Sequence, residues 1–176
     1  MRSYSLASFL VLGVAAFAIG CDDDDDDPTG PLPETFEATL TGAAERPDPR
    51  TTPAQGTADF TLSGDTLYWT ITMTSITNVT AAHIHIGAAD VAGGILVPLT
   101  PPVSNTSITG LIAEEDFTAP GPPNDAVTFD SMIALMRTGG VYVNVHTNDT
   151  SNDPTNNTGP GDFPAGEIRG QIARVP

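Results

Sequence analysis

The chain contains no lysine, and its six basic residues are outnumbered by 22 aspartates and glutamates, so the formal net charge is −16. Six of these aspartates form one run, Asp22 to Asp27. From Glu34 onward, 16 acidic residues and five arginines remain, which gives a formal charge of −11. Nucleic-acid binding requires a basic surface that displaces counterions from the phosphates. The composition therefore excludes nucleic acid as a partner, and it disfavours direct binding to anionic lipid headgroups.

The only cysteine is Cys21, which excludes an internal disulfide. It follows an apolar run from Leu6 to Ile19 that is shorter than the about 20 residues needed to span a membrane. Ala18-Ile19-Gly20-Cys21 resembles a bacterial lipobox, in which the cysteine becomes the lipidated first residue of the mature protein. We therefore expect a lipoprotein signal peptide at residues 1–20 and lipidation at Cys21. The alternative is an ordinary secretory signal that leaves Cys21 as a free thiol.

Residues 21–33 combine the aspartate run with a stretch rich in proline, and neither can bury apolar surface. We expect a disordered acidic tether there, followed by a single domain at residues 34–176. The aspartate run is either a charged spacer or a sorting signal. These features predict an exported protein of a bacterial cell envelope, held through its lipid at the outer membrane or the cell surface.

Short segments in which apolar and polar residues alternate, separated by Gly, Pro, Asn and Asp, recur along the domain and indicate an all-β antiparallel sandwich. Trp69 lies in phase with Leu67 and Ile71, which predicts a core position between the two sheets, beside Phe60 and Leu62. One short helix is expected after a cap at Asp130-Ser131, ending at residues 138–140. Strands are expected near residues 36–40, 58–62, 67–73, 80–87, 94–99, 106–112, 126–129, 140–147 and 166–174.

All three histidines of the chain lie in two strand-like segments, residues 82–86 and 141–146. Because side chains alternate along a strand, His83 and His85 project from one face, and His146 leaves its own strand on the polar face. Neutral imidazoles in such an arrangement suit Cu(II) or Zn(II). The alternative is structural, since buried histidines can instead hydrogen-bond to backbone carbonyls and fix the strand register.

Signals for catalysis are few. The sequence has no nucleophile elbow, phosphate-binding loop or zinc-protease motif. Glu114-Glu115-Asp116 groups three acidic residues, but adjacent residues do not define an acid/base pair, and a solvated edge is the simpler interpretation. An enzyme is therefore the less favoured class.

Five segments of the domain are weak signals singly but specific together. They are Phe36-Glu37-Ala38-Thr39-Leu40-Thr41-Gly42-Ala43 with Glu45, Gly56-Thr57-Ala58, Ala82-His83-Ile84-His85, Tyr142-Val143-Asn144-Val145-His146-Thr147 and Gly166-Glu167-Ile168-Arg169-Gly170-Gln171. Together they resemble the chordin-type (CHRD) domain of the animal extracellular protein chordin and of many bacterial exported proteins. The resemblance implies an immunoglobulin-like, superoxide-dismutase-like Greek-key β-sandwich, distantly similar to copper/zinc superoxide dismutase.

The resemblance bears on whether the three histidines bind a metal, because the dismutase also places His-x-His on one strand and a further copper ligand on a late strand. His83, His85 and His146 would match these three ligands. A fourth copper ligand and a histidine-rich zinc loop have no counterpart, since the chain has no other histidine. Superoxide chemistry is therefore not expected.

Two functions follow from these observations. The first is a non-enzymatic module that binds an extracellular protein or matrix component, as the resemblance to chordin implies. The second is a lipoprotein that binds Cu or Zn through His83, His85 and His146. Glu167 and Arg169 share one face of their strand, and we expect a mainly structural motif in which they pair with each other or with a neighbouring strand. Ligand recognition is the alternative role for this pair.

Overall fold

The computed structural model describes residues 32–99, 104–119, 121–149 and 158–176. The predicted signal peptide, Cys21 and the aspartate run lie outside the described residues. Within these ranges no helix is long and apolar enough to cross a membrane.

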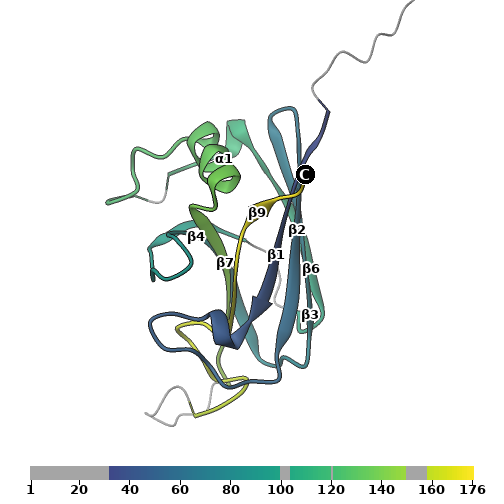
Figure 1. Cartoon of the computed structure of the whole chain (residues 1–176), viewed down its shortest axis with the longest axis vertical. Coiled ribbons are helices and arrows are strands. Elements are labelled where there is room, and N and C mark those ends of the chain that lie inside the picture. Colours follow the sequence, from purple (N-terminus) through teal and green to yellow (C-terminus); the bar gives the residue numbers. More distant parts are fainter. Residues whose placement is uncertain (1–31, 100–103, 120, 150–157) are drawn as a thin grey trace, which may run out of the picture.

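Nine strands in the described ranges form one antiparallel sheet that folds over into two facing layers (Figure 1). One layer contains β1 (Glu34–Thr41), β2 (Gln55–Ser63), β3 (Thr66–Thr74) and β6 (Ser107–Ala113). The other contains β4 (Val79–Ile86), β5 (Ile95–Pro98), β7 (Val141–Thr147) and β8 (Ile168–Gln171), and the short β9 (Ala173–Arg174) pairs with β1. The strand order is β5-β4-β7-β8-β1-β2-β3-β6. The prediction of an all-β sandwich with one short helix is confirmed.

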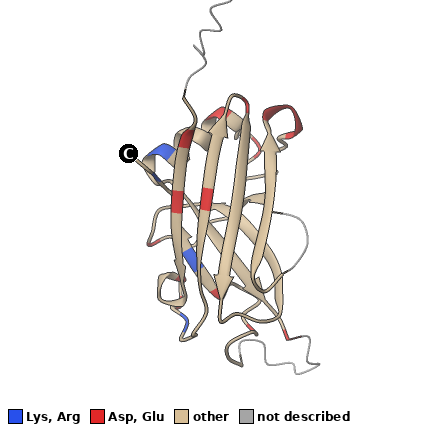
Figure 2. Ribbon diagram, turned by 90° about the vertical axis from the view of Figure 1, so that its right-hand side faces the viewer, with Lys and Arg blue, Asp and Glu red and all other residues tan. Residues whose placement is uncertain are grey.

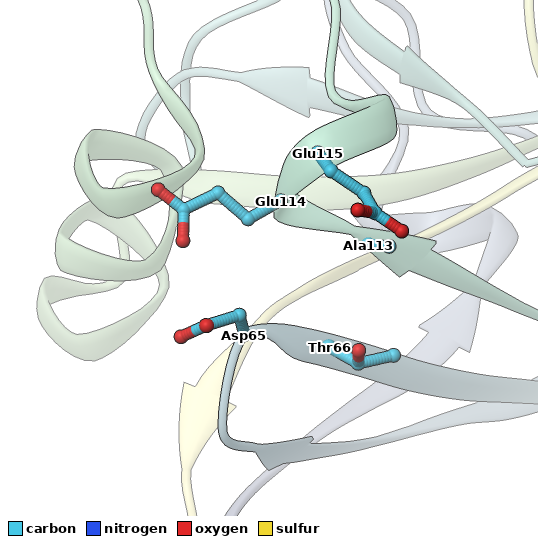
Figure 3. A pocket seen from close by; sticks show the side chains of 5 residues that line it. All are labelled: Asp65, Thr66, Ala113, Glu114 and Glu115. Atoms are coloured by element: carbon cyan, nitrogen blue, oxygen red, sulfur yellow. The ribbon is translucent and has the colours of Figure 1, made fainter.

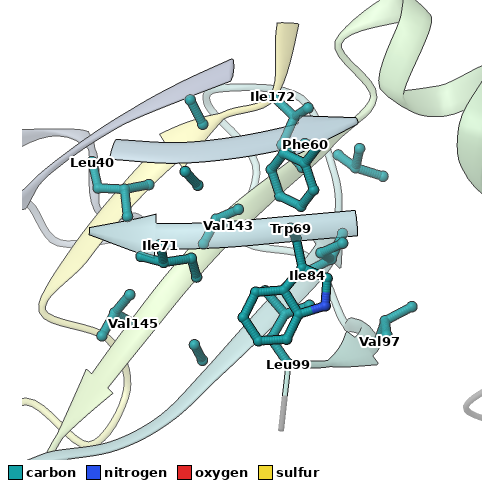
Figure 4. Packing of buried hydrophobic residues seen from close by; sticks show 14 of the residues in the cluster. Leu40, Phe60, Trp69, Ile71, Ile84, Val97, Leu99, Val143, Val145 and Ile172 are labelled. Atoms are coloured by element: carbon teal, nitrogen blue, oxygen red, sulfur yellow. The ribbon is translucent and has the colours of Figure 1, made fainter. Parts of the chain in front are cut away.

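The apolar core lies between the layers and includes Trp69 (Figure 4). Phe60 pairs with Trp69 across β2 and β3, and Trp69 pairs with Gly110 across β3 and β6. Phe60 and Trp69 are each 2% exposed, and Leu62 packs against the same core while partly buried. A β-carbon at Gly110 would lie 2.5 Å from Cζ2 of Trp69, so the indole occupies the space that a side chain would need. The core position predicted for Trp69 is confirmed.

The predicted strand at 126–129 is wrong, because this segment leads into the helix α1 (Phe129–Thr138). Thr128 is the N-cap, two residues before the expected cap. Its hydroxyl accepts from the amide of Ser131, whose own hydroxyl accepts from the amide of Thr128 at 2.7 Å. This reciprocal capping fixes the start of the helix. Gly139 ends it in the left-handed conformation (φ 69°), which glycine adopts without steric cost.

Acidic residues lie on the strands of the first layer and in the loops at its ends, with few basic ones among them (Figure 2). Glu34 on β1 accepts from Arg137 of α1 at 2.7 Å and lies 3.3 Å from Arg174 of β9. These ion pairs hold the helix and the last strand against β1. Two short 3-10 helices, η1 (Gly42–Ala44) and η2 (Glu114–Asp116), follow β1 and β6.

Candidate metal centre

The face of the second layer that points away from the apolar core carries polar side chains in rows. In one row His83 of β4 pairs with Asn144 of β7, which pairs with Arg169 of β8. Residues opposite each other on antiparallel strands project to the same side, so these three side chains are neighbours. Asn144 is 5% exposed and Arg169 only 2%. Loops therefore cover this face over β7 and β8, and these two strands are buried on both sides.

A second row crosses the same strands and joins His85, Tyr142 and Gln171. His146 pairs with Ala81 and lies next to the first row. The structure thus brings together the three histidines, as the strand pattern predicts. The ring centroids of His83 and His146 are 4.8 Å apart, those of His83 and His85 are 5.6 Å apart, and those of His85 and His146 are 5.9 Å apart.

Backbone carbonyls fix which nitrogen of two histidines carries the proton. Nδ1 of His85 lies 2.9 Å from the carbonyl oxygen of Gly93, and Nδ1 of His146 lies 3.0 Å from that of Pro164. Because a carbonyl only accepts, both Nδ1 atoms must donate, and Nε2 of each neutral ring is left with a lone pair.

The two lone pairs have different surroundings. Nε2 of His146 lies 3.0 Å from Nδ1 of His83 and accepts its hydrogen. Nε2 of His85 is buried and has no hydrogen-bond partner. A buried nitrogen lone pair without a donor costs free energy, and a metal ion is one group that would satisfy it.

Burial keeps all three rings neutral. Burial, together with the charges that His146 and His85 would carry, lowers the pKa of His83 to about 4. Burial also lowers the pKa of His85 and of His146, although their carbonyl partners act in the opposite direction. Near pH 7 the cluster therefore presents neutral imidazoles, the form that coordinates metals.

The donor set fits a divalent transition metal. One nitrogen from each ring lies within 4.8 Å of the other two. Nitrogens bound to a tetrahedral ion at about 2.0–2.1 Å are roughly 3.4 Å apart. The widest separation would therefore have to close by about 1.4 Å, and the hydrogen bond from His83 to Nε2 of His146 would have to give way to the ion. The carbonyls that accept from Nδ1 of His85 and His146 are the kind of outer contact that orients ligating histidines.

Tyr142 and Arg169 hold His85 in place. The Tyr142 ring stacks on His85 with centroids 5.0 Å apart and an interplanar angle of 13°. Its hydroxyl accepts from the amide of Gly93 at 3.0 Å. The guanidinium carbon of Arg169 lies 3.4 Å from the centre of the same ring. No role was predicted for Tyr142 from the sequence. Its alternation in phase with Asn144 and His146 is the pattern that indicates its position on this face.

Glu45 is a second residue whose role was missed, because it belongs to a loop with no periodicity. It is 2% exposed, and burial raises its pKa to about 7 against the opposing charges of Arg169 and Arg50. Oε2 of Glu45 accepts from the side-chain amide of Asn144 at 3.4 Å, whereas its Oε1 is buried without a partner. A buried, under-bonded carboxyl thus lies behind the first row of polar side chains.

The carboxylate of Glu167 and the guanidinium of Arg169 have different partners. Glu167 accepts from the hydroxyls of Thr52 and Thr147 and from the amide of Gly161. Arg169 donates to the carbonyl of Ala88 at 2.8 Å. Glu167 therefore ties three segments together around the end of β7, and Arg169 ties the segment after β4 to β8.

A separate open pocket of about 430 Å³ lies between the β2–β3 turn and η2. Asp65, Glu114 and Glu115 line it, and all three are exposed. Figure 3 shows Asp65 and Glu114 extending in one direction and Glu115 in another. The geometry agrees with a solvated acidic edge and not with a paired acid and base.

An antiparallel sandwich with a buried polar face behind its core defines the class of domain. The family model described as CHRD domain matches residues 36–153, well over half of the 176-residue chain. The chain therefore belongs to the CHRD domain family. The match includes all three histidines and ends before Glu167. A comparison with curated proteins finds no match.

Proposed function

We propose that this protein is a lipid-anchored, non-enzymatic CHRD module of a bacterial cell envelope whose three-histidine cluster binds one Cu(II) or Zn(II) ion. The observation that carries the metal assignment is Nε2 of His85, which is buried, deprotonated and unpartnered beside two further imidazoles. His83, His85 and His146 would supply three ligands, and the chain has no further histidine for a fourth. A water molecule or another small ligand would complete a tetrahedral set.

The metal assignment is tested by loading the purified mature protein with ZnCl₂ or CuCl₂, removing free metal and measuring bound metal by mass spectrometry. We expect one ion per chain. His85→Ala and His146→Ala should lose it, whereas Thr70→Ala, on the opposite layer, should retain it. Equal metal content in the wild type and both histidine variants would refute the site.

The module's broader role is to bind an extracellular protein or a matrix component, which family membership supports. The lipid at Cys21 would hold the domain at the outer membrane or the cell surface, with residues 21–33 as a solvated spacer. The soluble domain, labelled and titrated onto envelopes of cells that lack the protein, should bind saturably. Binding that rises linearly with concentration would exclude a specific partner there.

A further inference from the structure

A second feature adjoins the histidine cluster. An open pocket of about 640 Å³ lies on the β5 side of β4, and His83 is part of its wall. His83 pairs with Pro98 of β5 on this side and with Asn144 of β7 on the other. The residues that line the pocket include His83, Ile95, Pro98, Thr118 and Ala119.

His83 is the residue that the cluster and the pocket share. Its Nδ1 is directed to His146 within the cluster, and the residue is half-buried. His85, by contrast, is 7% exposed and does not line the pocket. A small molecule in the pocket would therefore reach the cluster alongside His83.

The residues that line the pocket indicate what kind of molecule it can bind. Apart from His83, none of the described lining residues has an ionisable side chain. Proline, isoleucine and alanine supply apolar surface, and Thr118 supplies a hydroxyl. The volume lies within the roughly 300–1,000 Å³ that small-molecule sites occupy. The acidic surface of the protein would also oppose the approach of an anion.

We infer that the pocket binds a neutral, largely apolar molecule that places a nitrogen donor on the open coordination position of a metal held by the three histidines. The inference rests on the proposed metal site. Three protein ligands leave one position of a tetrahedral ion free. The apolar part of the molecule would lie against Ile95 and Pro98, and its donor would point toward the cluster past His83.

The test uses mature protein loaded with Co(II), whose visible absorption reports its ligands, and compares 4-phenylimidazole with imidazole and acetate. We expect 4-phenylimidazole to shift the cobalt spectrum and to bind at least tenfold more tightly than imidazole, with acetate weaker than both. Ala119→Trp fills the pocket and should remove the preference for 4-phenylimidazole while imidazole still binds. Ala126→Trp, an equal change at an exposed position outside the pocket lining, should preserve it.

The outcomes separate the two proposals. If the wild type takes up no cobalt, the metal site and the inference both fail. If cobalt binds but 4-phenylimidazole has no advantage over imidazole, or keeps its advantage in Ala119→Trp, only the inference fails. It fails equally if 4-phenylimidazole binds without changing the cobalt spectrum, because the molecule then does not reach the metal.

Discussion

Gly93 holds His85 through its carbonyl, which accepts from Nδ1 of the imidazole at 2.9 Å. The amide of the same glycine donates to the hydroxyl of Tyr142, whose ring stacks on His85. One residue thus orients the imidazole directly and through a neighbour. No larger residue fits, since a β-carbon at Gly93 would lie 1.6 Å from the carbonyl oxygen of Ile86.

Gly93→Ala should therefore displace the segment after β4 and disturb His85. Loss of a contact that orients a metal ligand typically weakens metal affinity by about 10–100-fold, and we expect a loss in this range. Zn(II) affinity measured by competition with a chromophoric chelator checks the prediction. Gly94→Ala is the control, because its β-carbon would meet only the movable side-chain amide of Asn124 at 3.3 Å. Equal affinities for the two variants would contradict this role of Gly93.

Metal binding should persist into mildly acidic solution. Protons compete with metal for imidazole, and competition begins near pH 6.5 for an ordinary histidine. Burial lowers the pKa of His83 to about 4 and lowers those of His85 and His146. The Zn(II) affinity should thus change little between pH 7.5 and pH 6 and fall only at lower pH. A tenfold fall per pH unit already at pH 6.5 would disagree with the buried geometry.

Glu45 should make the fold less stable as the pH rises. Its pKa is about 7 in the folded protein and 4.5 as the ordinary value. The protonated form is therefore favoured by folding, and its contribution is full below pH 4.5 and lost as the pH rises through 7. The pKa difference corresponds to roughly 3 kcal/mol. In urea unfolding, Glu45→Gln should be more stable than the wild type at pH 8, with the advantage disappearing near pH 5. An advantage independent of pH would mean that ionisation of Glu45 is not its cause.

Trp69 should dominate the stability of the core. Trp69→Ala should cost about 3–5 kcal/mol, because it leaves a large cavity between the layers. Gly110→Val should destabilise for the opposite reason, since its side chain would overlap the indole. Thermal unfolding of both variants checks this pair. Gly64→Ala, in an open turn, tests whether glycine replacement alone has an effect, although its φ of 56° makes a small cost expected. Melting of Trp69→Ala at the wild-type temperature would remove this residue from the core.

Cys21 should carry the membrane anchor. Cys21→Ser removes the thiol that would be acylated, so the protein should move from the membrane fraction to the soluble fraction. Two or more acyl chains anchor stably where one does not, which predicts a nearly complete redistribution. Fractionation followed by immunoblotting measures it. An unchanged membrane fraction would rule out lipidation at this residue.

Much of the sandwich could be predicted because alternation along a strand reports burial directly. β3, with Leu67, Trp69, Ile71 and Met73 buried in alternation, is the clearest case. The strand expected at 126–129 failed because a threonine cap is a local interaction that overrides a short apolar pattern. β7 is different again: its alternation predicts a polar, solvated face, yet Tyr142 and Asn144 are buried as well. Loops distant in sequence cover that face, and no strand periodicity encodes them.

The candidate site could likewise be predicted only in part. The common face of His83 and His85 follows from their spacing, and their proximity to His146 follows from pairing between β4 and β7. The partners of the histidines could not be predicted, because Gly93 and Pro164 contribute backbone carbonyls. Every residue has such a carbonyl, so the residue type does not indicate which one accepts. Glu45 was equally hidden, since only the fold shows that a loop carboxyl is buried.

Three donors bind the side chain of Glu167, which implies that the segments carrying them open together. Their amide protons would then exchange with solvent in one shared event. Thr52, Thr147 and Gly161 come from different segments, and each donates to the same carboxylate. Releasing one of them leaves a buried carboxyl group with fewer donors, so partial opening costs more than the one contact that is lost. The amide protons of Gly161 and Phe163, the latter bound to Thr147, should then exchange with deuterium at a common rate set by a shared opening.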